Sequence, residues 1–105
     1  MKITLSEQIF VGNFGDNSDS ENSAAANNYY RIVFGELSEY ISKNWPDAEI
    51  SDDMNIENAS GCARHFEVFA DGCSDTDEIM VTNMIRAEFD KITRRMEQSG
   101  EVYGE

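Results

Sequence analysis

The sequence predicts an α+β fold: a two-layer sandwich in which two helices share one face of a small antiparallel or mixed sheet. Segments in which apolar residues recur at every second position, typical of strands, and segments in which they recur every three or four positions, typical of helices, follow one another in the order β-α-β-β-α. The chain has 105 residues, of which 40% are hydrophobic and 10% aromatic, which is enough for one packed core but not for several domains. We therefore expect one acidic domain over residues 1–105, with a short tail at 101–105.

The first eleven residues predict a half-buried strand. Apolar residues at alternate positions are separated by polar ones, and Glu7 interrupts the apolar series, which predicts a bulge or a break. Residues 12–22 are polar and contain glycine, so they predict a flexible loop. The apolar positions of the strand are Met1, Ile3, Leu5, Ile9 and Val11.

A helix is predicted next, with Asn22 or Ser23 as its N-cap. It should end near Asn44, because Pro46 pushes the residue before it toward an extended conformation. Its apolar residues recur at intervals of three and four, as one face of a helix requires. They are Ala26, Tyr30, Val33, Leu37, Tyr40 and Ile41.

Two further strands are predicted over residues 47–57 and 62–70. Apolar and acidic residues alternate in the first of them, so one of its faces should be almost entirely acidic. The turn signal at residues 58–61 indicates that the two strands form a hairpin, which Asp71 and Gly72 close.

The last element is predicted to be an amphipathic helix. Asp75 with Glu78, or Ser74 with Asp77, supplies a start signal that resembles a capping box, and Gly100 ends the helix. The complete order resembles a ferredoxin-like fold that lacks its last strand. The core stripe of this helix comprises Val81, Ile85, Phe89, Ile92 and Met96.

Charge is the main functional clue in the sequence. The chain holds 21 Asp and Glu but only 8 Lys and Arg, for a net charge of −13, which excludes a basic nucleic-acid-binding surface. Two segments, 47–61 and 71–78, contain acids and no base. Their acidic residues are the predicted partner-binding site: Asp47, Glu49, Asp52, Asp53 and Glu57 in the first, and Asp71, Asp75, Asp77 and Glu78 in the second.

No residue pattern predicts catalysis, a cofactor or a metal site. Neither Asp16 nor Asp71 begins a calcium loop with the required glycine and glutamate. Cys62 and His65 fall on opposite faces of a predicted strand and Cys73 follows its far end, so they should not share a zinc ion and both thiols should be free. Paired carboxylates for hydrolysis cannot be singled out among so many acids. We expect a protein that is not an enzyme.

Clustered carboxylates present a surface similar to the phosphate array of nucleic acid, and such a surface binds grooves rich in Lys and Arg. By size, charge and two-layer architecture, the chain resembles the DNA-mimic inhibitors encoded by phages and plasmids, which include anti-CRISPR and anti-restriction proteins. The resemblance implies non-catalytic inhibition of a basic nucleic-acid-binding protein or complex.

Three alternatives remain open at this point. The first is an immunity protein or antitoxin that neutralises a basic nuclease. The second is a structural or adaptor subunit whose charge serves only solubility and which docks through Phe10, Phe14 or Trp45. The third is a small metal-dependent enzyme. A homodimer is also open. The chain has no apolar run long enough for a membrane span, and its first residues become polar too early for a secretory signal, so we expect a cytoplasmic protein.

Overall fold

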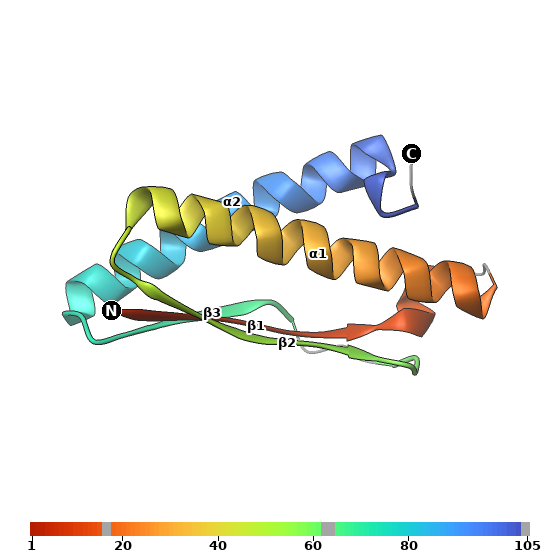
Figure 1. Cartoon of the computed structure of the whole chain (residues 1–105), viewed down its shortest axis with the longest axis horizontal. Coiled ribbons are helices and arrows are strands. Elements are labelled where there is room, and N and C mark those ends of the chain that lie inside the picture. The colour runs from red at the N-terminus through yellow and green to blue at the C-terminus, as the bar shows by residue number, and fades with distance from the viewer. Residues whose placement is uncertain (16–17, 62–64, 104–105) are drawn as a thin grey trace.

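The computed structural model describes residues 1–15, 18–61 and 65–103, and these form two layers (Figure 1). Two long helices lie on one face of a three-stranded sheet, which confirms the predicted α+β class and the order β-α-β-β-α. The strands are β1 (Lys2–Phe10), β2 (Glu49–Glu57) and β3 (Glu67–Asp71), and the helices are α1 (Asp19–Asn44) and α2 (Asp75–Ser99).

The sheet has the order β2-β1-β3, so the predicted hairpin between the second and third strands is wrong. β2 runs parallel to β1, because α1 returns the chain to the end at which β1 begins. β3 runs antiparallel to β1 on its other side. The alternation of apolar and polar residues predicts on which face of the sheet a residue lies, but it does not predict which strands pair with one another. β3 also begins later than predicted, at Glu67, and residues 62–64 of the predicted strand are outside the described part of the chain.

The core lies between the sheet and the helices. Leu5 of β1, Leu37 of α1 and Ile85 of α2 are each completely buried there. Burial of such a side chain stabilises the fold by about 1.5–3 kcal/mol. The predicted bulge or break at Glu7 is wrong, because β1 is continuous and pairs with β2 through Met54 at this position.

Capping serines determine where both helices begin. Ser18 caps α1 by accepting a hydrogen bond from the backbone amide of Glu21 at 3.3 Å, so the helix begins before the predicted caps and includes residues 19–22 of the predicted loop. Ser74 caps α2 by accepting from the amide of Asp77 at 3.1 Å, which is one of the two predicted starts. Gly100 ends α2 in the left-handed conformation (φ +69°), as predicted.

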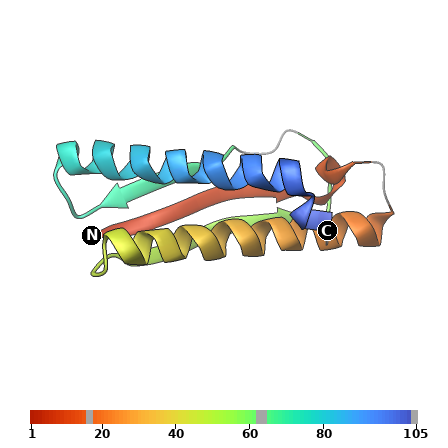
Figure 2. The ribbon, with the colours of Figure 1, turned by 90° about the horizontal axis from the view of Figure 1, so that it is seen from above.

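Residues 101–103 of the predicted tail pack back on the molecule, and its last two residues lie outside the described part of the chain. Residues 101–103 form a short 3-10 helix, η2 (Glu101–Tyr103), near the start of α1 (Figure 2). The hydroxyl of Tyr103 donates to the carbonyl of Phe14 at 2.8 Å, and the side-chain amide of Asn28 donates to the carbonyl of Val102 at 2.9 Å. Phe14 belongs to the other short 3-10 helix, η1 (Val11–Phe14).

Candidate protein interface

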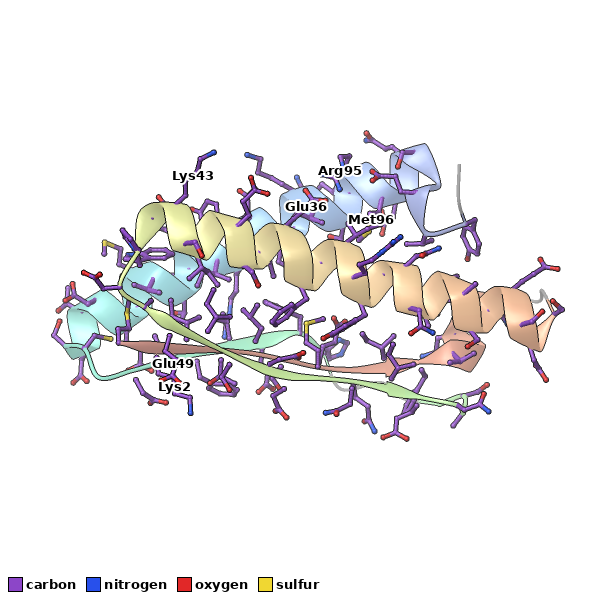
Figure 3. The ribbon with its side chains drawn as sticks, viewed as in Figure 1. Lys2, Glu36, Lys43, Glu49, Arg95 and Met96 are labelled. Carbon is purple, nitrogen blue, oxygen red and sulfur yellow. The ribbon has the colours of Figure 1, made fainter. Side chains whose placement is uncertain are left out.

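The face of the sheet opposite the helices is open and acidic. Side chains alternate between the two faces of a strand, so every second residue of each strand points away from α1 and α2. Figure 3 shows Lys2 and Glu49 on this side of the sheet. The register aligns Glu49 and Asp71 on either side of Lys2, and Asp53 and Glu67 on either side of Ser6. We call five residues the open acidic face: Glu49, Asp53, Glu57, Glu67 and Asp71.

The carboxylates of the open acidic face form two rows. Along each edge strand they occur at every fourth residue, which separates them by about 13 Å. The two rows are separated by β1, which makes them about 10 Å apart. Lys2 is the only cation that the three strands contribute to this face within the described residues. The rows can therefore bind two lines of Lys or Arg side chains on a facing surface.

Ser6 anchors one of these carboxylates. It is only 3% exposed although it points to the open side, and its hydroxyl donates to Asp53 at 2.8 Å. Phe69 of β3 lies between the positions of Glu67 and Asp71 and is 46% exposed, so the face also offers one aromatic contact.

The other acidic residues of the predicted site lie at different places. Asp52 belongs to the helix-facing side of β2, where it accepts a hydrogen bond from the hydroxyl of Tyr30 and another, at 2.9 Å, from the amide of Met54. Asp47 is exposed in the turn before β2. The remaining three occupy the first turn of α2, close to the beginning of β1 (Figure 1): Asp75, Asp77 and Glu78.

The nine predicted residues thus divide between the two edge strands, the turn before β2 and the start of α2, rather than forming one hairpin edge. The structure brings Glu49, Asp53, Glu57 and Asp71 to one face. Glu67 belongs to the same face and was missed. The alternation of the strand puts it on the opposite side from Val68 and on the same side as Phe69.

Two of the aromatic residues considered for an adaptor are engaged in intramolecular packing. Phe14 packs edge-to-face against Tyr29, with ring centroids 5.9 Å apart, and Trp45 packs in the same way against Tyr40 at 6.1 Å. Both are half-buried. Phe10 is half-buried as well, so Phe69 is the exposed aromatic residue on the open side of the sheet.

Besides Asp52, the carboxylate of Glu7 lies on the helix-covered side of the sheet, where it is largely buried. The hydroxyl of Tyr29 donates to both oxygens of Glu7, at 2.9 Å each. Burial raises the pKa of Glu7 to about 7, an effect that the hydrogen bond from Tyr29 only partly offsets. Burial and the nearby Glu7 charge also raise the pKa of Tyr29. Glu7 borders a hollow of about 470 Å³ whose other charged lining residues include Arg86 and Asp90.

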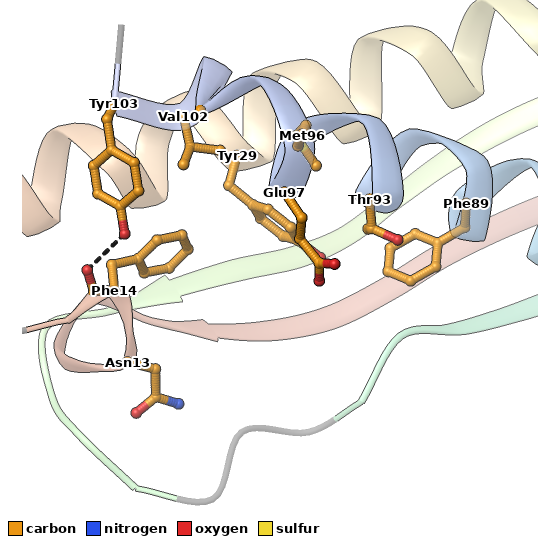
Figure 4. Close-up of a pocket in the computed structure, with 10 residues that line it drawn as sticks. Asn13, Phe14, Tyr29, Phe89, Thr93, Met96, Glu97, Val102 and Tyr103 are labelled. Carbon is orange, nitrogen blue, oxygen red and sulfur yellow. Dashed lines mark hydrogen bonds between the residues drawn. The ribbon is translucent and has the colours of Figure 1, made fainter. Parts of the chain in front are cut away.

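A second hollow, of about 530 Å³, lies beside the C-terminal half of α2 (Figure 4). Its lining is mainly apolar and aromatic, and the hydroxyl of Tyr103 closes one side through its bond to the Phe14 carbonyl. Glu97 is its one charged lining residue. The hydroxyl of Thr93, which also lines the hollow, donates to the backbone carbonyl of Asp90 at 3.1 Å.

The thiol and carboxylate side chains do not form a metal centre in the described ranges, where no three His, Cys, Asp or Glu converge on a point that could hold an ion. Cys73 is free, and burial with the nearby charges of Asp77 and Glu78 raises the pKa of its thiol. Cys62, the other predicted free thiol, is outside the described residues.

Comparison with known proteins gives no match to this chain among protein-family models, curated proteins or solved structures. Neither α1 nor α2, the long helices of the described residues, has the length and apolar character needed to cross a membrane. The surface chemistry of the described residues is therefore the basis for a functional proposal.

Proposed function

We propose that this protein is a non-catalytic acidic inhibitor, which binds the basic nucleic-acid-binding surface of a partner protein in the manner of a DNA mimic. One observation supports the proposal above the others: the open acidic face displays its carboxylates in two rows on a sheet surface that α1 and α2 leave uncovered.

The spacing of the rows is compatible with this role. They are about 10 Å apart, which lies between the widths of the minor and major grooves of B-DNA, about 6 and 12 Å. A protein groove that contacts phosphates on both sides of a DNA groove can therefore meet a carboxylate on each side of β1. The total charge of −13 would steer the encounter from a distance.

The proposal is tested by asking whether the protein displaces basic proteins from DNA. Nucleic-acid-binding proteins from a bacterial lysate are loaded on a DNA resin at low salt, and the purified protein is used as the eluent. We expect elution of a specific DNA-binding protein or complex, whose affinity for the protein falls steeply as salt rises. Its identity also distinguishes an immunity protein, which would elute a nuclease toxin, from an inhibitor of other DNA-binding machinery.

A pair of charge-matched variants tests whether binding depends on the open acidic face or on the net charge of the whole protein. Glu49, Glu57 and Glu67 are changed to Gln in one variant, which removes three charges from the open acidic face. The control removes the same charge from exposed helix positions by Glu39→Gln, Asp90→Asn and Glu97→Gln. Each closely paired charge couples by about 1.5 kcal/mol or more, so the first variant should lose several kcal/mol of affinity, mainly through faster dissociation. Equal losses in both variants would reject a localised face, and no loss in either would reject charge-based binding.

A further inference from the structure

The outer edge of β2 has backbone groups with which no strand of the described residues pairs. β2 is the last strand in the order β2-β1-β3 of the described residues. The amide of Glu49 donates to the carbonyl of Met1 at 2.9 Å, so Glu49 directs its backbone groups toward β1. Backbone direction alternates along a strand, and residues of the opposite parity therefore present their N–H and C=O groups at the free edge. They are Ile50, Asp52, Met54 and Ile56.

One of these four amides is occupied. The amide of Met54 donates to a carboxylate oxygen of Asp52, and the hydroxyl of Tyr30 holds the other oxygen. Within the described part of the chain, the structure gives the amides of Ile50, Asp52 and Ile56 no hydrogen-bond partner. The free edge is nine residues, or about 30 Å, long, whereas β3 at the opposite edge has only five residues. β2 is the better template for an added strand.

The charges of β2 select the kind of strand that can be added. In an antiparallel pair of two β2 strands centred on Asp53, Glu49 of each copy would lie opposite Glu57 of the other, and like charges directly opposite one another destabilise a sheet. A second copy of this chain is therefore disfavoured. A strand with Lys or Arg at alternate positions would instead place cations beside these carboxylates while its backbone pairs with the edge.

We propose that the partner contributes an extended basic segment, which adds to the free edge of β2 as a fourth strand. This inference rests on the proposed function and specifies how a basic partner would be held: the backbone bonds give affinity, and alternate cations opposite Glu49, Asp53 and Glu57 give specificity. It extends the open acidic face sideways, because the new strand continues the same sheet surface.

The test uses three short peptides with the intact protein. The first is a capped nine-residue peptide of alternating Lys and Thr, with Lys at both ends. The second carries N-methyl groups on the Thr amides only, and the third carries them on the inner Lys amides only. With Lys on the open side of the sheet, antiparallel pairing directs the Thr amides toward β2, whereas parallel pairing directs the Lys amides toward it. Affinities are measured by fluorescence anisotropy at low salt.

We expect one methylated peptide to bind at least about tenfold more weakly than the unmethylated peptide. The other methylated peptide should bind as tightly as the unmethylated one. The identity of the weakened peptide reports the strand direction. Equal binding of all three peptides would overturn the added strand, as would equal losses in both methylated forms or no binding of the unmethylated peptide. Displacement of basic proteins from the DNA resin is measured independently, so the proposed function can hold when this inference fails.

Discussion

The two faces of the sheet are built from the same three strands but have opposite chemistry. The side toward the helices carries buried apolar residues such as Ile3, Leu5 and Val68. The other side carries the five residues of the open acidic face. Residues adjacent in sequence therefore belong to different environments, and the domain keeps a core although its net charge is −13.

Three residues depart from this division. Glu7 and Asp52 are acids on the helix-covered side, and Ser6 is a buried residue on the open side. Each has a hydrogen-bond partner within the fold, because a tyrosine hydroxyl donates to each of the two acids and Ser6 donates to Asp53. Where a polar side chain lies on the helix-covered side or a buried one on the open side, a specific hydrogen bond therefore compensates for the exception to the alternation.

The largest effect should come from the core side. Leu5→Ala removes a completely buried side chain and should lower the free energy of unfolding by about 3 kcal/mol, because the cavity it leaves cannot fully close. The control is Gln8→Ala on the open side, for which we expect a loss below about 1 kcal/mol. Urea denaturation measures both, and similar losses would show that the two faces do not differ in packing.

A smaller and pH-dependent effect is expected at Glu7. Its pKa is raised in the folded protein to about 7, from 4.5, so the folded state holds a proton that the unfolded state has released between these values. The stability contributed by this group is therefore present below the unfolded pKa and is lost as pH rises through the folded pKa. Wild type should lose about 2 kcal/mol from this group between about pH 5 and pH 8.

Glu7→Gln keeps an acceptor for Tyr29 and removes the titration. The variant should be more stable than wild type by about 2 kcal/mol near pH 8, with the difference much reduced near pH 5. Thermal unfolding across this pH range provides the measurement. A difference between variant and wild type that is constant with pH would contradict the burial of an ionisable Glu7.

The bond between Ser6 and Asp53 should contribute a more modest amount. Ser6→Ala removes a buried donor to a carboxylate and should cost about 1 kcal/mol. A double-mutant cycle with Asp53→Asn isolates the coupling between the two side chains, since Asp53 makes further interactions of its own. A coupling energy near zero would mean that Ser6 is buried without stabilising the open face.

The smallest effect concerns self-repulsion among exposed acids. The variant with Glu49, Glu57 and Glu67 changed to Gln should be slightly more stable than wild type at low salt, by about 0.5 kcal/mol, because repulsion within the face is relieved. The gain should disappear at high salt, where exposed charges are screened. A loss of stability at low salt would instead indicate that these carboxylates make stabilising contacts within the fold.

The elements that could be predicted from sequence are those with strong local signals. The last helix followed from its apolar stripe and from Gly100, and the end of the first helix followed from Pro46. The predicted start of α1 is too late, because the three alanines after Ser23 are strong helix formers and favour a cap at Asn22 or Ser23. Ser18 and Glu21 form the capping signal that the structure uses.

The candidate site was predictable only in its chemistry. Four members of the open acidic face could be named from charge and alternation: Glu49, Asp53, Glu57 and Asp71. Asp52 was assigned with them because its segment is acidic, but its parity in β2 places it on the helix-facing side beside Tyr30. Glu67 was missed because Arg64 nearby made its segment look neutral.

Local patterns in the chain specify the fold class, the helical stripes and the alternation of side chains between the faces of each strand, because these depend on periods of 3.6 and 2. The position of β1 between β2 and β3 comes from the packing of the whole domain, and it separates the acidic strands into two rows where the sequence predicted one hairpin edge. Strand order depends on how the helices pack across the sheet and return the chain. That packing joins residues far apart in sequence, and no local pattern encodes it.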